Sequence, residues 1–184
     1  ANGVGSGSKV LRCVQDDGIG WKDGRMKINC IGGGPASLYF AILMKKSYPR
    51  AEITVAEQNR FDDTFGFGVV FSDKTMENFR VADEPTYRAI TGAFEHWDDI
   101  DIHVKGQVLK STGHGFAGMS RVKMLILMQQ RCQELGIKLH FQHRIDDPES
   151  LRDCDLLYAA DGVNSATRER YKDRFKPNID FRPQ

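Results

Sequence analysis

The 184-residue sequence has little net charge, no long apolar segment and no secretory signal pattern at its start. Its 26 basic side chains, lysine and arginine, nearly balance 25 acidic ones. The resulting net charge of +1 gives no general attraction to nucleic acid or to an anionic membrane. No apolar run approaches the roughly 18 residues that a spanning helix needs. We therefore predict neither a nucleic-acid partner nor a membrane partner.

Cysteine is also scarce, with four residues at Cys13, Cys30, Cys132 and Cys154. Their wide spacing contains no Cys-x-x-Cys pair, which argues against a zinc site, and we predict no metal. Cys30 lies in an apolar strand pattern and Cys132 in a helical one. We interpret these thiols as reduced and mostly buried, which predicts a cytoplasmic protein.

The first 25 residues differ from the remainder of the chain. They are rich in Gly and Ser at the start and carry turn signals such as Asp16-Asp17-Gly18, and Met26 is a natural start for the fold. We therefore interpret 1–25 as a leader, linker or cloning remnant and exclude it from the fold.

A clean βαβ pattern begins at Met26. Residues 27–31 form a short, largely apolar strand, and three glycines interrupt it. Pro35 suits the first turn of the helix that follows, and residues 52–56 predict a second strand. The unit spans about 30 residues, the usual size of a mononucleotide-binding βαβ unit.

The glycines occupy the G-x-G-x-x-G/A frame of dinucleotide-binding loops, with Ser37 in the last place. Gly32 allows the turn out of the strand, Gly34 lets a pyrophosphate approach the backbone, and a small third residue lets helix and strand pack closely. Glu57 follows the second strand, where a carboxylate can accept hydrogen bonds from ribose hydroxyls. These features predict a dinucleotide site that includes Gly32, Gly34, Pro35, Ala36, Ser37 and Glu57.

The middle of the chain shows shorter elements. Residues 66–71 predict a turn that leads into a strand, and Asp83 predicts the N-cap of a helix through about His96. Residues 100–104 alternate as a half-buried strand does, and Val108 and Leu109 suggest the return strand of a hairpin.

The last third returns to helix–strand alternation. Ser120 predicts an N-cap, and Gly136 suits the left-handed position after the end of the same helix. Alternation over 137–141 predicts another strand, and residues 155–160 predict a short buried strand that ends at Asp161-Gly162.

Residues 27–60 resemble the ADP-binding unit of the para-hydroxybenzoate hydroxylase-like FAD-dependent monooxygenases, and the fourteen residues 155–168 resemble their second, Asp-Gly element. The resemblance implies that Asp161 and Gly162 lie beside FAD, and that Arg121 reaches its phosphates or ribityl chain. A guanidinium suits a pyrophosphate. Such a charge in the first turn opposes the helix dipole, which favours a functional role.

Three further segments are similar to the salicyloyl-CoA 5-hydroxylase and 2-aminobenzoyl-CoA monooxygenase group: 26–36, 66–72 and 113–121. Tryptophan hydroxylases of indole pigment biosynthesis share the Gly-x-Gly-Val-Val pattern. The resemblance implies hydroxylation of a small aromatic or aryl-CoA substrate by FAD, O2 and transiently bound NAD(P)H, through a flavin C4a-hydroperoxide. His114 is the one candidate catalytic residue, facing the flavin or substrate, although a lone histidine is more often structural.

The sequence thus predicts an α/β fold: a Rossmann-like FAD-binding domain with a parallel sheet flanked by helices, and the beginning of a β-rich substrate domain. We assign 26–184 to the FAD domain, with a partial substrate-binding insertion at about 66–116. A third FAD element of the superfamily, containing Gly-Asp-Ala, is absent, so we expect a C-terminally truncated fragment, prone to self-association or completed by another polypeptide. The alternatives are a non-catalytic nucleotide-binding or interaction module and a flavin-dependent dehydrogenase or reductase.

Overall fold

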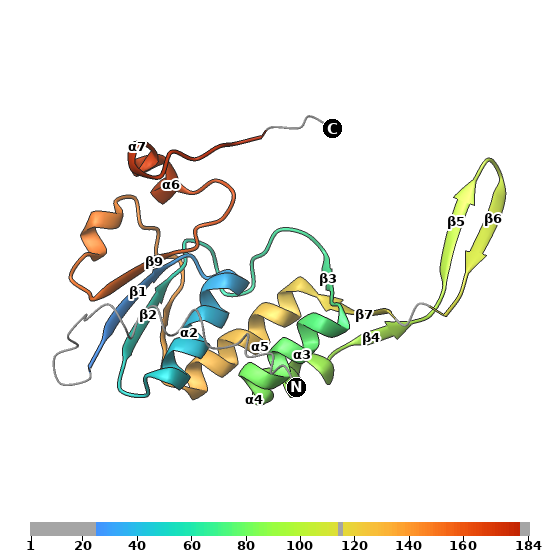
Figure 1. Cartoon of the computed structure of the whole chain (residues 1–184), viewed down its shortest axis with the longest axis horizontal. Coiled ribbons are helices and arrows are strands. Elements are labelled where there is room, and N and C mark those ends of the chain that lie inside the picture. The colour runs from blue at the N-terminus through green and yellow to red at the C-terminus, as the bar shows by residue number, and fades with distance from the viewer. Residues whose placement is uncertain (1–24, 114–115, 181–184) are drawn as a thin grey trace, which may run out of the picture.

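The computed structural model describes residues 25–113 and 116–180 (Figure 1). Its strands are β1 (Lys27–Ile31), β2 (Glu52–Ala56), β3 (Gly68–Val70), β4 (Glu95–Trp97), β5 (Ile100–Val104), β6 (Gln107–Ser111), β7 (Phe116–Ser120), β8 (Lys138–His140) and β9 (Leu156–Ala159). Its helices are α2 (Pro35–Ser47), α3 (Asp73–Ala82), α4 (Glu84–Thr91), α5 (Arg121–Glu134), the 3₁₀ helix η2 (Pro148–Leu151), α6 (Ala166–Arg170) and α7 (Lys172–Phe175).

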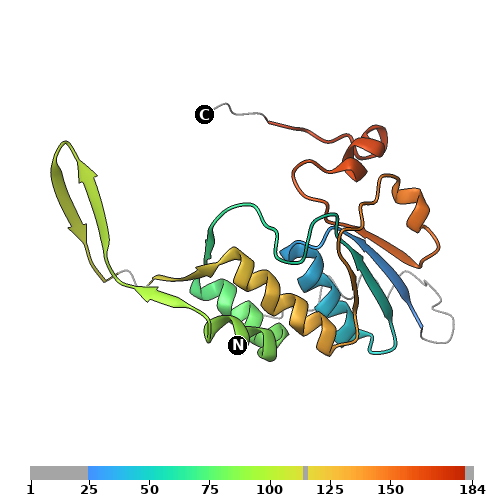
Figure 2. The same cartoon turned by 180° about the vertical axis from the view of Figure 1, so that it is seen from behind.

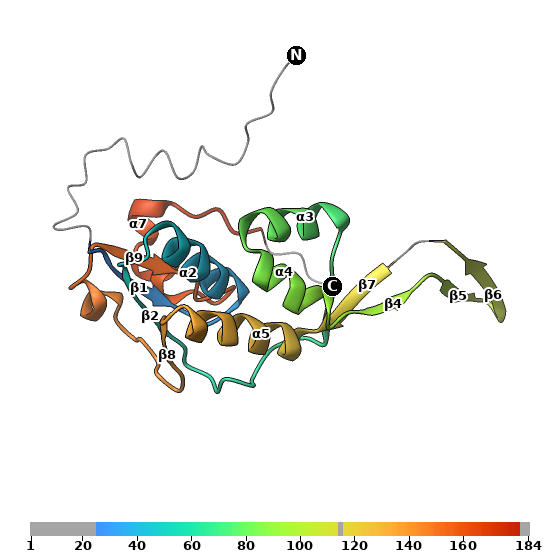
Figure 3. The ribbon, with the colours of Figure 1, turned by 90° about the horizontal axis from the view of Figure 1, so that it is seen from below.

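A four-stranded parallel sheet, in the order β8-β2-β1-β9, forms the centre of the fold. Helix α2 packs on β1 and β2, and α5 packs on β8 and against α2, so the two helices cover one face of the sheet (Figure 3). The core lies between these layers and includes the fully buried Ile28, Leu38 and Met128. The predicted α/β fold is confirmed.

The opposite face of the sheet is crossed by the connection from β8 to β9, which contains η2. Asn29 alternates with the core residues of β1 and donates from Nδ2 to the carbonyl of Leu151 at 2.9 Å. Strand β9 lies at the sheet edge, so its residues 156–158 are only half-buried, whereas the sequence predicted a buried strand. The Tyr171 hydroxyl donates to Glu149 of η2, which ties the C-terminal helices to this connection.

The second part of the fold is antiparallel. Strands β3, β7 and β4 form a three-stranded sheet, and β7 continues directly into α5. Strands β5 and β6 form the predicted hairpin, which projects away from the body of the molecule (Figures 1 and 2). The sequence predicted that one face of the strand at 100–104 is buried. This was wrong, because Ile102 and Val104 on that face are each 47% exposed.

The helix predicted after Asp83 is shorter than the sequence indicated. Asp83 does cap α4 by accepting the Thr86 N–H at 3.2 Å, but the helix ends at Thr91 with Gly92 as its C-cap. His96 instead pairs with Ala117 as part of β4. Helix α4 also follows a helix, α3, that the sequence patterns did not predict.

The predicted burial of two thiols is confirmed. Cys30 and Cys132 are 1% and 0% exposed, and burial raises the pKa of each to about 12, so both stay protonated. Cys13 lies outside the described residues. Within the described ranges, no helix is long and apolar enough to cross a membrane.

Candidate functional site

A cleft lies at the carboxyl ends of the parallel strands, at the point where β1 and β9 are neighbours. The chain leaves β1 toward β2 on one side and reaches β9 on the other, so the connections diverge at this point. Open α/β sheets bind ligands at such a switch point. The loops after four strands line the cleft: 32–35, 57–61, 141–145 and 160–164.

Gly32 and Gly34 serve different purposes in the loop after β1. Gly32 has φ +95°, and a Cβ there would lie 2.4 Å from the Ala160 carbonyl oxygen, so packing against β9 requires glycine. A Cβ on Gly34 would meet nothing within 4 Å, because it would project into open space. The backbone at Gly34 is therefore accessible to a ligand in the cleft.

The N-terminus of α2 opens at the same place. Gly34 is its N-cap and provides no side-chain hydrogen bond, Pro35 occupies the first turn, and no acidic side chain lies there. The uncapped N–H groups and the positive end of the helix dipole favour an anion. Ala36 is exposed and Ser37 fully buried, and neither lines the cleft. The place of Ser37 suits the close helix–strand packing expected of the third fingerprint position.

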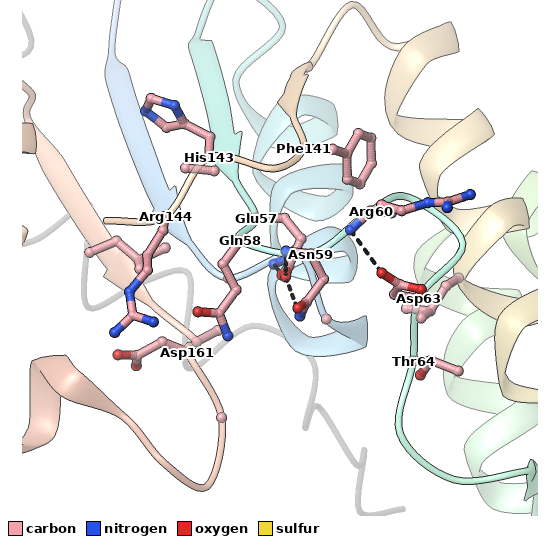
Figure 4. A pocket seen from close by; sticks show the side chains of 18 of the residues that line it. Glu57, Gln58, Asn59, Arg60, Asp63, Thr64, Phe141, His143, Arg144 and Asp161 are labelled. Atoms are coloured by element: carbon pink, nitrogen blue, oxygen red, sulfur yellow. Dashed lines mark hydrogen bonds between the residues drawn. The ribbon is translucent and has the colours of Figure 1, made fainter. Parts of the chain in front are cut away.

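Glu57 stands next to this loop at the end of β2. Its Oε2 accepts the Gly33 N–H at 2.5 Å, and its Oε1 accepts the backbone and side-chain N–H groups of Asn59, each at 2.8 Å (Figure 4). A Cβ on Gly33 would lie 2.8 Å from the Glu57 Cβ, so this glycine makes room for the glutamate. The carboxylate is thus held at the rim of the glycine loop.

Arg121 lines the cleft from the first turn of α5. Its Nε donates to the Thr64 hydroxyl at 2.9 Å, and no ion pair of Arg121 occurs among the described residues. The other two cleft arginines, Arg60 and Arg144, bind neighbouring aspartates at 3.0 and 2.7 Å. Arg121 is therefore the arginine whose charge remains for an anionic ligand.

The Asp161 side chain, in the connection after β9, turns toward the start of α6. Its Oδ1 accepts the Ser165 hydroxyl at 2.6 Å, and its Oδ2 accepts the Thr167 N–H at 3.0 Å. Burial alone would raise the pKa of Asp161, but these hydrogen bonds outweigh it and hold the pKa below its ordinary value. The carboxylate therefore stays ionised and orders the turn at Gly162, which has φ +80°.

The chain resembles known proteins over most of its length. The chain is 44% identical over 155 residues to a salicyloyl-CoA 5-hydroxylase of Streptomyces sp., a match that covers 84% of this chain and 30% of that protein. It is 35% identical over 143 residues to the 3-hydroxy-4-methyl-anthranilyl-(aryl-carrier protein) 5-monooxygenase of Streptosporangium sibiricum, covering 78% and 40% respectively. The chain is similar to the N-terminal part of these aromatic monooxygenases.

The match covers only part of the length of each of these proteins. The chain spans about 30 to 40% of the length of these curated relatives and corresponds to their N-terminal part. The crystal structure of CtdE in complex with FAD has the same fold, with a TM-score of 0.64 and 18% identity, over 79% of this chain and 40% of that one. No protein-family model matches the chain.

The structure brings together most of the site residues predicted from the sequence. Gly32, Gly34, Pro35, Glu57, Arg121, Asp161 and Gly162 all line the cleft. His114, the candidate catalytic residue, lies outside the described residues. Sequence reasoning missed Asn59, Thr64 and Arg144, although their places just after β2 and β8 were a usable signal, because the carboxyl ends of parallel strands meet at one edge.

Proposed function

We propose that this chain binds the ADP part of FAD in the cleft and serves as the N-terminal part of an aromatic-ring monooxygenase. One observation carries the proposal: the uncapped N-terminus of α2 and the open space at Gly34 lie beside a fixed carboxylate, Glu57. This set matches the needs of a nucleotide, with N–H donors for the pyrophosphate and an acceptor for the ribose hydroxyls.

Different groups in the cleft bind different parts of the nucleotide. The α2 N-terminus and the Arg121 guanidinium neutralise the pyrophosphate, while Glu57 orients the ribose. Asp161 acts on the far wall by holding the Gly162 turn, whose backbone then faces the ligand. Bound FAD would supply hydride acceptance from NAD(P)H and transfer of one oxygen atom from O2 to the ring of the substrate.

For the whole protein, we propose a small aromatic substrate presented as a thioester. The support lies in the names of two relatives, one acting on a salicyloyl-CoA and one on an anthranilyl group held by an aryl-carrier protein. We also propose that β3, β4, β7 and the hairpin begin the substrate-binding domain. Exposed Val70 on this sheet, and exposed Phe67 directly before β3, favour contact with a further polypeptide segment or a second copy. A cytoplasmic location stays a prediction.

The decisive experiment for cofactor binding is the visible spectrum of the purified chain after incubation with FAD and desalting. We expect retained bands at about 370 and 450 nm, the positions of oxidised flavin. A folded chain that retains no flavin would contradict FAD binding by this part of the protein. FMN serves as the matched control, because it lacks the AMP part of FAD and should wash out.

We expect Arg121→Met to weaken FAD binding at least tenfold, because a charge-assisted contact to the pyrophosphate is lost while the apolar stem is kept. Titration of the chain with FAD, followed by flavin fluorescence, measures the change. Arg88→Met is the control, since Arg88 lies on the exposed side of α4 and should leave the affinity unchanged. Equal affinities of the Arg121 variant and the unchanged chain would remove Arg121 from the site.

A further inference from the structure

We propose that Asn59 is a positioning residue that aims the Glu57 carboxylate at the ribose of the bound nucleotide. The inference rests on the proposed nucleotide binding and adds a residue that the sequence motifs do not include. Asn59 would act through Glu57, without a contact of its own to the ligand.

The contacts of Glu57 carry the proposal. Both N–H groups of Asn59, on the backbone and on Nδ2, donate to the same oxygen, Oε1, at 2.8 Å. The Gly33 N–H holds the other oxygen, Oε2, at 2.5 Å. A carboxylate offers about four lone-pair sites, so three donors fix its plane and still leave an acceptor position. The carboxylate is thereby oriented before the ligand arrives.

The backbone of Asn59 is held independently of its side chain. The Asn59 carbonyl accepts the Gln142 N–H at 3.0 Å, and the Glu57 carbonyl accepts the His143 N–H at 2.8 Å. The Glu57 N–H in turn donates to the His140 carbonyl at 2.8 Å. The loop after β8 therefore supports this turn through main-chain bonds, which a change of the Asn59 side chain leaves in place.

Removal of the amide should therefore loosen the Glu57 side chain, which keeps only the main-chain N–H donors of Gly33 and Asn59, without unfolding the turn. A mobile carboxylate must lose rotamer freedom when it binds the ribose, and that cost lowers affinity. This loss of affinity arises only for ligands whose ribose hydroxyls donate hydrogen bonds to Glu57. A merely structural defect would instead weaken every nucleotide alike.

The test compares ADP with 2′,3′-dideoxy-ADP by isothermal titration of the 184-residue chain. In the unchanged chain, ADP should bind more tightly than the dideoxy ligand. In Asn59→Ala, we expect the affinity for ADP to fall about tenfold and that for dideoxy-ADP to change less than about twofold. Asn59→Asp should behave alike, because it keeps the size of the side chain but replaces the Nδ2 donor with a like charge.

Two controls make the result specific. Asn78→Ala removes an exposed amide on α3, outside the cleft, and should leave both affinities unchanged. In a Glu57→Gln background, Asn59→Ala should have little further effect on the ratio. The thermal midpoint of each variant shows that it is folded.

The outcomes separate this inference from the proposed function. If folded Asn59→Ala loses both affinities by the same factor, or changes neither, the role of Asn59 is overturned while nucleotide binding stands. Failure of the unchanged chain to bind either ligand overturns the proposed function, and the inference with it.

Discussion

Replacement of Asp83 by asparagine is expected to lower the free energy of unfolding by about 3 kcal/mol. Asp83 is fully buried, yet its carboxylate binds Arg131 of α5 through two hydrogen bonds, at 3.0 and 3.1 Å. The Lys46 ammonium of α2 lies 2.9 Å away, and Thr86 donates from both its backbone and hydroxyl. One carboxylate thus joins three helices, and its removal takes the acidic partner from Lys46 and one of two acidic partners from Arg131, which keeps Glu134.

The effect should depend on pH in a definite direction. Burial alone would raise the pKa of Asp83, but the hydrogen bonds from Arg131, Thr86 and Lys46 outweigh it and hold the pKa far below the ordinary 3.8. A depressed folded-state pKa stabilises the fold above the unfolded-state value, and this contribution is lost as the pH falls. The stability difference between the unchanged chain and Asp83→Asn should therefore be constant near neutral pH and shrink below about pH 4.

Denaturant unfolding of both proteins at several pH values measures this difference. The control is Glu84→Gln, which breaks an exposed ion pair with Arg88 on the same helix and should change stability little. A loss in Asp83→Asn no larger than that of the control would show that the buried cluster is not a principal source of stability.

Gly34→Val is expected to abolish flavin retention and to leave the fold nearly intact. Gly34 has φ −74° and ψ 175°, which any residue adopts, and an added Cβ would meet no protein atom within 4 Å. The valine side chain would occupy the space that the proposed pyrophosphate needs. The stability cost should stay below about 1 kcal/mol, the range of an unfavourable N-cap.

Gly32→Ala is the matched control, because it should lower the stability of the fold, which Gly34→Val should leave nearly intact. Its positive φ and the approach of a Cβ to the Ala160 carbonyl should destabilise the fold by on the order of 3 kcal/mol. Flavin retention after desalting and thermal unfolding, measured on both variants, separate binding from folding. Retention of FAD by Gly34→Val would exclude close approach of the pyrophosphate at this position.

Local patterns in the sequence were sufficient for the first βαβ unit and for several helix starts. The strands at 27–31 and 52–56 agree with the structure because apolar residues and the glycine loop are close in the chain. Ser120 and Asp83 were identifiable as caps because each accepts an N–H only three residues later. The same locality made it possible to predict the glycine loop and Glu57 as neighbours.

Elements that depend on distant partners were predicted less well. Nothing near His96 in the sequence indicates that it pairs with Ala117, so the helix was extended too far. The alternation in the hairpin predicted its pairing correctly but not its exposure, since burial depends on which element covers a face.

The sequence by itself determined the α/β class, the glycine loop with its acidic neighbour and the resemblance to aromatic monooxygenases, because each depends on residue types at short, fixed spacing. Only the tertiary structure decided that Asn59 fixes Glu57, that Arg121 has a neutral partner, and that Asp161 hydrogen-bonds to the start of α6. It alone showed that Asp83 and Arg131, 48 residues apart, meet in a buried pair. These contacts are made by side chains on loops and on separate helices, where the direction of a side chain follows from the packing of the whole chain and from no local period.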